Sequence, residues 1–310
     1  MIRKKIFILF GVILFARQIA FAGELSVTEE FRNQIVQADY GEAKSRNVIQ
    51  ILKSHAEVKA EFGGSYVTSI SNSKNREWKE EGNVHWFYYV NGVLAHVGAS
   101  LYHPGSDDNI WWDLHPWDGK RYIGAVIGAW PEPFLHGYNG KVLPTRIWVT
   151  DPFEKDGRLL QKVLLAKGVQ SVDLLKLKQN SAIDFEKSFP IYIGTWTELI
   201  KTASLSDLFQ HAEQVGLFLD FNESGDFSPL TWEGKKIKSH QKAAAIIALK
   251  SAAEAVNPIW FVTGTDDILI ARAVDFLIRS EKSIKGRSGV FLTEEGITSI
   301  PIFDSLGKIN

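Results

Sequence analysis

The 310-residue chain contains no cysteine and a single methionine. The absence of cysteine excludes disulfide bonds, thiolate catalysis, a cysteine-rich zinc site and lipid attachment through an N-terminal cysteine. The sequence also lacks a basic run or stripe, which argues against nucleic acid as a partner. The G-x-S-x-G and H-E-x-x-H patterns are missing too. The sequence therefore favours a non-catalytic protein over an enzyme.

Residues 1–22 have the pattern of a signal peptide. A basic start precedes the apolar run Ile6–Ala16, which is too short to cross a bilayer comfortably, and Ala20-Phe21-Ala22 fits a cleavage site. An uncleaved anchor is the alternative. This segment carries four basic residues and no acid, so its removal lowers the formal net charge from −1 to −5. We expect a secreted or periplasmic protein that has no membrane contact after cleavage.

What the chain does have is a concentration of aromatic residues in His85–Asp118. This stretch holds four of the ten tryptophans and four of the eight histidines. A large aromatic side chain can bury roughly 150–250 Å². Soluble proteins rarely leave large apolar patches in water. These rings therefore lie in a core, against a second domain, or on a ligand.

The pattern over residues 24–118 predicts one helix on a small mixed sheet, an α+β arrangement. Val84–Asn91 alternates and reads as the central strand, and Asn91-Gly92 is a strong hairpin signal. The other expected elements are a helix at Glu42–Ala56 and strands at Glu57–Phe62, Tyr66–Ser71, Val93–Ser100 and Ile110–Leu114. Leu25–Val36 is only weakly strand-like.

These residues carry a resemblance to a known family. A strand ending in W-x-Y-Y-V-N-G, then Y-x-x-x-x-G-x-x-D and I-W-W, is similar to the domain of unknown function DUF4430. The matching positions are Trp86, Tyr88, Tyr89, Val90, Asn91, Gly92, Tyr102, Gly105, Asp108, Ile110 and Trp112.

That family is similar to the C-terminal domain of transcobalamin and intrinsic factor. The resemblance implies a β-grasp-like fold and a non-catalytic binding domain, some members of which cap a corrinoid. One departure is that the family's first strand precedes the helix, where this chain has only the weak segment Leu25–Val36.

Strand alternation divides the aromatic residues between two faces. Trp86, Tyr88 and Trp112 share one face and are expected to pack in the core. Side chains on the other face or beyond the strands are the candidates for a ligand or a domain interface near the domain junction. The predicted ligand-binding residues are Phe87, Trp111, Trp117, His115 and Trp130.

Residues 120–303 alternate extended and helical patterns, which predicts an α/β domain. Expected strands are Tyr122–Trp130, Thr145–Thr150, Val172–Leu177, Pro190–Gly194 and Ile259–Gly264, with hairpins at Gly216–Asn222/Ser228–Trp232 and Val290–Thr293/Ile297–Ile302. Expected helices are Arg158–Lys167, Thr195–Lys201, Leu205–Val215, Ser239–Val256 and Asp266–Arg279. The Ala-rich Ser239–Val256 has the strongest helical signal.

Two further residue sets in this part could carry chemistry. Asp220, Asn222, Ser224 and Asp226 resemble the first half of a calcium loop, but position twelve is a threonine rather than a glutamate. A plain hairpin turn is the favoured interpretation, so calcium binding is not expected to be strong.

The second set is Glu132, His136 and Asp151, which could act as an acid–base group on loops.

The sequence thus leads to a main hypothesis and two alternatives. The main hypothesis is an exported, non-catalytic binding protein for a corrinoid or another large planar small molecule held by aromatic rings. An exported hydrolase with its site on loops of the second domain is the alternative. A third is a cell-envelope protein whose aromatic surface contacts another protein.

Overall fold

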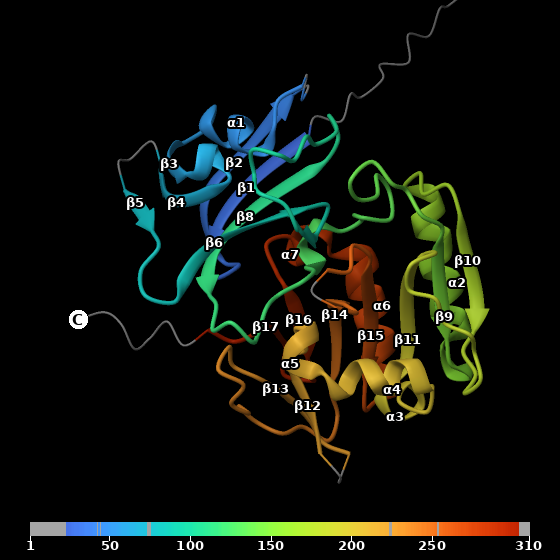
Figure 1. The fold of residues 1–310 in the computed structure, drawn as a ribbon. Helices are drawn as coiled ribbons and strands as arrows, with labels where there is room; N and C mark the ends of the chain where they lie inside the picture. Colours follow the sequence, from blue (N-terminus) through green and yellow to red (C-terminus); the bar gives the residue numbers. More distant parts are fainter. Residues whose placement is uncertain are drawn as a thin grey trace, which may run out of the picture.

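A computed structural model describes residues 23–41, 43, 45–72, 76–222, 225–252 and 254–303. The predicted signal peptide lies outside these residues. Among the described residues, no helix has the length and apolar character needed to span a membrane. The chain forms two lobes, each built on its own large sheet (Figure 1). We call them the N-terminal lobe and the C-terminal lobe.

The N-terminal lobe is organised around a five-stranded sheet in the order β2-β1-β8-β6-β7. Its strands are β1 (Gly23–Glu29), β2 (Asn33–Gly41), β6 (Val84–Val90), β7 (Val93–Leu94) and β8 (Asn109–Pro116). Strand β8 runs parallel to β1 and antiparallel to β6, so the sheet is mixed. Leu25–Val36, which is only weakly strand-like in sequence, therefore lies in the two strands β1 and β2 at one side of this sheet.

One face of this sheet is covered by a helix and a small second sheet. The helix is α1 (Val48–Lys53), and the strands are β3 (Glu57–Glu61), β4 (Tyr66–Ser71) and β5 (Glu77–Lys79). The helix is shorter than predicted because Asn47 caps it, accepting a hydrogen bond from the Gln50 amide. Trp86, Tyr88 and Trp112 pack in the core on this face, as strand alternation predicts.

The C-terminal lobe contains a seven-stranded sheet in the order β10-β9-β11-β15-β14-β16-β17. These strands are β9 (Thr145–Val149), β10 (Val172–Lys176), β11 (Phe189–Thr195), β14 (Ala244–Lys250), β15 (Pro258–Gly264), β16 (Gly289–Leu292) and β17 (Ile297–Ile300). The first four in the order are parallel, whereas β14 is antiparallel to β15.

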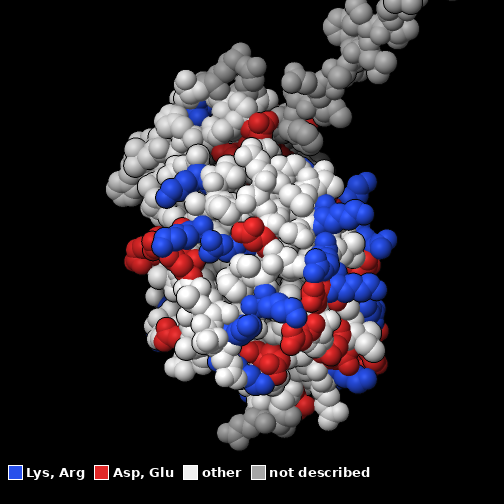
Figure 2. Space-filling view, turned by 90° about the vertical axis from the view of Figure 1, so that its right-hand side faces the viewer, with Lys and Arg blue, Asp and Glu red and all other residues white. Residues whose placement is uncertain are grey.

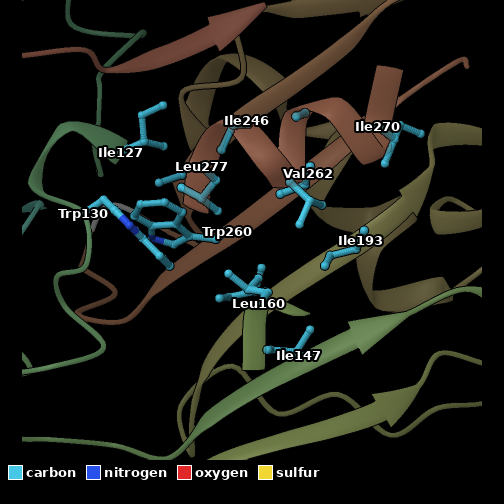
Figure 3. Packing of buried hydrophobic residues seen from close by; sticks show 14 of the residues in the cluster. Ile127, Trp130, Ile147, Leu160, Ile193, Ile246, Trp260, Val262, Ile270 and Leu277 are labelled. Carbon is cyan, nitrogen blue, oxygen red and sulfur yellow. The ribbon is translucent and has the colours of Figure 1, made fainter. Parts of the chain in front are cut away.

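Helices cover both faces of this sheet. The helices are α2 (Glu154–Ala166), α3 (Trp196–Leu199), α4 (Ala203–Gln210), α5 (Ala212–Val215), α6 (Asp267–Arg279) and α7 (Glu281–Ile284). Helices α2 and α6 pack on one face, where Leu160 and Leu277 contact the core around Trp260 (Figure 3). Helices α3 to α5 and the hairpin of β12 (Leu219–Phe221) and β13 (Phe227–Pro229) lie on the other. The α+β fold class is confirmed.

The predicted helix at Ser239–Val256 is wrong. Its centre is strand β14, in which all seven side chains are buried between β15 and β16. A short apolar run buried on both faces cannot be told from a buried helix by periodicity. The alanine content suggested a helix, but the two neighbouring strands offer hydrogen-bonding partners that override helix propensity.

One further predicted strand is wrong, and another is much shorter than predicted. Tyr122–Trp130 contains only a 3-10 turn, Ile127–Ala129, and an isolated bridge between Val93 and Ala125. The expected return strand Val93–Ser100 is reduced to the two residues of β7. The two segments meet, because Gly124 and Val126 exchange backbone hydrogen bonds with Leu94 and Gly92 beside the isolated bridge.

The lobes meet through the second face of the five-stranded sheet. Tyr89 and Trp111 of this face join one buried cluster with Phe218 and Trp232 of the C-terminal lobe. The side of the molecule at the right of Figure 1 is seen face-on in Figure 2, where basic and acidic side chains are interspersed over the C-terminal lobe. Tyr89 and Trp111 are thus turned toward the C-terminal lobe and away from solvent.

Asn91, in the turn after β6, forms hydrogen bonds to both lobes. It is fully buried with φ of 50°, and its Nδ2 donates to Asp108 Oδ1 and to the Gly137 carbonyl, each at 2.7 Å. Its Oδ1 accepts from the Asn109 amide at 2.8 Å. A Cβ on the following Gly92 would lie 2.8 Å from the Val126 carbonyl. The hairpin turn therefore fastens the two lobes together.

We expect Asn91→Ala to lower the free energy of unfolding by about 2–4 kcal/mol, because it leaves buried groups without partners. Asn139-Gly140 is a matched control, since Asn139 also has positive φ but is exposed. Asn139→Ala should lower the free energy of unfolding by only about 1 kcal/mol, because alanine adopts the left-handed backbone conformation less readily than asparagine. Urea denaturation measures both values, and equal losses would contradict a special role for Asn91.

Candidate functional site

A buried hydrogen-bond network lies beneath the second face of the five-stranded sheet. Trp111 Nε1 donates to Thr28 Oγ1 at 2.7 Å, and this hydroxyl donates to Asp113 Oδ1 at 2.5 Å. Asp113 Oδ2 lies 2.8 Å from His115 Nδ1. Trp111 and His115 are each only 2% exposed. The structure therefore places these two predicted ligand residues inside the contact between the lobes.

Beside this network the lobes separate and leave a cavity of about 690 Å³, which we call the aromatic groove. Phe87, Leu94 and Trp117 line it from the N-terminal lobe. The C-terminal lobe and the segment joining the lobes contribute Tyr122, Asp207, His211, Gln214, Val215, Ser251, Ala252 and Glu254. The volume is within the range of small-molecule sites, roughly 300–1,000 Å³.

The rings of the aromatic groove are held in place from behind. Phe87 stacks on His115 with ring centroids 4.4 Å apart, and His115 is fixed by Asp113. Trp117 is 45% exposed and lies edge-on to Phe87 at 6.4 Å. Phe87 and Trp117 are the two predicted ligand residues that line the aromatic groove, and a buried imidazole orients one of them.

Tyr122 supplies a polar atom to this apolar surface, and sequence reasoning missed it. Its hydroxyl is buried and has no hydrogen-bond partner among the described residues. Burial, assisted by the negative charge of Glu254, raises the pKa of Tyr122 to about 12, so the hydroxyl keeps its proton. A buried polar group without a partner is unfavourable, and a ligand acceptor would satisfy it.

Lys250 is a second unexpected residue near the aromatic groove. It ends β14 and is only 1% exposed, just before the turn that lines the groove. Burial lowers the pKa of Lys250 to about 8, and Glu254 opposes this shift. A lysine inside an apolar run could have signalled burial, but the predicted helix at Ser239–Val256 gave no reason to single it out.

Trp130 lies elsewhere. It is 4% exposed and packs against Phe134 and Trp260, each with ring centroids 5.8 Å away (Figure 3). It belongs to the core of the C-terminal lobe and does not line the aromatic groove.

A second cavity, of about 990 Å³, lies between the lobes and contains Glu132 and His136. We call it the acid–base cavity. His136 Nδ1 lies 2.6 Å from Glu132 Oε1, and the His136 amide donates to Glu132 Oε2 at 2.9 Å. The hydrogen bond that His136 donates to Glu132 raises the pKa of His136. The charges of Asp107 and Asp108 add to this shift, and burial opposes it. This pair can hold and exchange a proton.

Asp151 does not join this pair. It follows β9, its side chain is 85% exposed, and it forms an ion pair with Lys176 at 3.1 Å. Glu132 and His136 precede β9, so they lie toward the opposite end of that strand. The expected three-residue set is therefore reduced to two.

The calcium-loop candidates lie in the β12–β13 hairpin. Asp220 Oδ2 pairs with Lys236 Nζ at 2.6 Å, and the Asp226 amide donates to Asn222 Oδ1 at 2.8 Å. Ser224 lies outside the described residues. Nowhere in the described ranges do three His, Asp or Glu side chains group as they would around a metal ion. The hydrogen bonds seen here are those of a hairpin turn.

Comparison with known protein families matches part of the chain. Residues 45–116 match the family DUF4430, a domain of unknown function. This range runs from the approach to α1 through β8, which confirms the family resemblance for this segment. Strands β1 and β2 and the whole C-terminal lobe lie outside it. No curated protein matches the chain.

The raised pKa of His136 makes stability depend on pH. A group whose pKa is raised on folding contributes stability that is present below its ordinary value of 6.5 and is lost as pH rises through the raised value. The free-energy difference between wild type and His136→Gln should therefore shrink as pH rises above about 6.5. Denaturation at several pH values measures it.

Burial raises the pKa of Asp108 above its ordinary value of 3.8, so the effect of Asp108 on the free energy of unfolding changes at lower pH than that of His136. In NMR titration, Glu132→Gln should lower the pKa of His136. If the difference in unfolding free energy between wild type and His136→Gln stayed constant or grew as pH rises, that result would contradict the Glu132–His136 interaction.

Proposed function

We propose that this protein is an exported, non-catalytic binding protein that holds a flat, largely apolar small molecule in the aromatic groove. The observation that carries this proposal is the exposed surface of Phe87 and Trp117, which lines a cavity next to the unpartnered Tyr122 hydroxyl. Residues 1–22 support export. No part of the proposal requires a metal ion or a catalytic group.

The exposed part of Trp117 gives a scale for the binding energy. With 45% of this side chain in contact with solvent, a stacked ligand would remove roughly 100 Å² of apolar surface from water. At about 25 cal/mol per Å² this contributes roughly 2–3 kcal/mol before the cost of association. Phe87 adds to this without reorganisation, because His115 already supports its ring.

The ligand class follows from the shape and polarity of the aromatic groove. Two rings favour a planar or polycyclic ligand, and Tyr122 favours one with a hydrogen-bond acceptor at its edge. A corrinoid has these properties and is the ligand that the family resemblance suggests. The groove would hold one edge of such a large molecule and leave the remainder in solvent.

Titration with cobalamin, with cobinamide and with smaller planar aromatic compounds tests this proposal. We expect saturable quenching of tryptophan fluorescence, and we expect Trp117→Ala to weaken binding about 10- to 100-fold. Phe62→Ala is the matched control, because Phe62 is a 79% exposed aromatic that does not line the aromatic groove.

Calorimetry on the same variants avoids interference from coloured ligands. Tyr122→Phe should weaken ligands that carry an acceptor and leave purely apolar ligands unaffected. The proposal would be wrong if none of these compounds bound, or if Trp117→Ala bound them as the wild type does.

A second candidate function, a hydrolase, is favoured by the Glu132–His136 hydrogen bond inside the acid–base cavity. With Nδ1 engaged by Glu132, Nε2 of His136 is the nitrogen that could accept a proton from an attacking water and return it to a leaving group. Glu132 would position the imidazole and stabilise its charged form.

A panel of ester, peptide and glycoside substrates tests this alternative. Any activity should fall at least about 100-fold in Glu132→Gln, which is the size expected for general acid–base catalysis. Glu281→Gln is the control, because Glu281 lines the same cavity but pairs with Lys167. Activity that survives in Glu132→Gln would remove this pair from the mechanism.

A further inference from the structure

A small third cavity lies where β1 of the N-terminal lobe faces the segment that follows α7 and strand β17 of the C-terminal lobe. Its volume is about 230 Å³, and we call it the seam pocket. Ser26, Thr28 and Arg32 line it from the N-terminal lobe. Lys285, Arg287 and Ser299 line it from the C-terminal lobe. It shares no lining residue with the aromatic groove.

The charge lining the seam pocket is of one sign. Arg32, Lys285 and Arg287 line it, and none of the described lining residues is acidic. Two of these cations are neutralised nearby, since Arg32 pairs with Glu30 and Lys285 pairs with Glu24. The chain as a whole has a formal net charge of −1, so a purely cationic lining is a local feature.

Arg287 is the cation of this pocket whose charge is not balanced by a described carboxylate. Its Nε donates to the Ser283 carbonyl at 2.7 Å, and its Nη1 donates to Ser299 Oγ at 2.6 Å. These two bonds hold the guanidinium in a fixed orientation. Neither partner is charged, so the half-buried positive charge would gain from a nearby anion.

Two neutral side chains of the lining can also act as donors. Because Ser299 Oγ accepts from Arg287, its own hydrogen is available to another acceptor. Asn109 also lines the pocket, and its buried side-chain oxygen has no partner among the described residues. Rotating this amide by half a turn would present its NH₂ group instead, and such assignments follow from the bonding partner.

We propose that the seam pocket binds an oxyanion, either inorganic phosphate or sulfate or the carboxylate of a small acid. Arg287, Ser299 and Asn109 supply hydrogen-bond donors, and the positive charge comes from Arg287. The volume suits one such group rather than a nucleotide. Because the donors come from both lobes, a bound oxyanion stabilises the contact between them. This inference is independent of the aromatic groove and of its ligand.

Isothermal titration of the mature chain with sodium phosphate, sodium sulfate and sodium acetate tests this inference, with sodium chloride at equal ionic strength as reference. We expect saturable binding of one equivalent and a matching rise in the unfolding midpoint. Preference for phosphate or sulfate identifies an inorganic oxyanion, and preference for acetate identifies a carboxylate. Either preference supports the proposal.

Arg287→Gln should weaken this binding about 10- to 100-fold, as expected for the loss of a charge-assisted hydrogen bond. Arg272→Gln is the matched control, since Arg272 is an exposed arginine of α6 that does not line the pocket. If Arg287→Gln does not fold, Ser299→Ala replaces it, with an expected loss of about 3- to 10-fold. No saturable binding beyond chloride, or unchanged binding in these variants, would overturn the proposal.

Discussion

The burial of the second face of the five-stranded sheet against the C-terminal lobe is the interaction on which the rest of the structure depends. Trp111 and Tyr89 pack there with Trp232, and the Tyr89 hydroxyl donates to the Ile123 carbonyl at 2.9 Å. A Cβ on Gly128 would lie 2.7 Å from the Trp111 ring, so the segment joining the lobes must pass close to it. The three cavities lie along this contact.

This contact also explains why one aromatic stretch serves two purposes. Where the C-terminal lobe covers the sheet, as at Trp111, the rings form a core. Where it does not, as at Trp117, the same kind of surface remains open to solvent and lines the aromatic groove. His115 links the two regions, because it is bonded to Asp113 on one side and stacked under Phe87 on the other.

Much of the N-terminal lobe could be predicted from sequence, because its signals are local. Alternation assigned Trp86 and Trp112 to the core face, and Asn91-Gly92 marked the turn. The C-terminal lobe was harder, because β14 depends on pairing with strands that are distant in sequence. Local composition favours a helix there, and only the sheet makes the extended form more stable.

The candidate sites show the same limit. The face that Phe87 and Trp111 share could be read from alternation, but how far the C-terminal lobe extends over that face could not. Tyr122 and Lys250 were missed because both lie against Gly124, a contact between segments that are distant in sequence. The Glu132–His136 pair was accessible through its spacing of four residues, whereas Asp151 required knowledge of which end of β9 faces the cavity.

The central claim is that Trp111 is sealed within the contact between the lobes while Trp117 remains open for a ligand. Hydrogen exchange of the indole N–H groups, followed by NMR, tests it most directly. The Trp111 N–H, bonded to Thr28, should exchange only when the lobes separate, whereas that of Trp117 should exchange fast and slow down when a ligand binds. Exchange of Trp111 as fast as that of Trp117 would contradict the account.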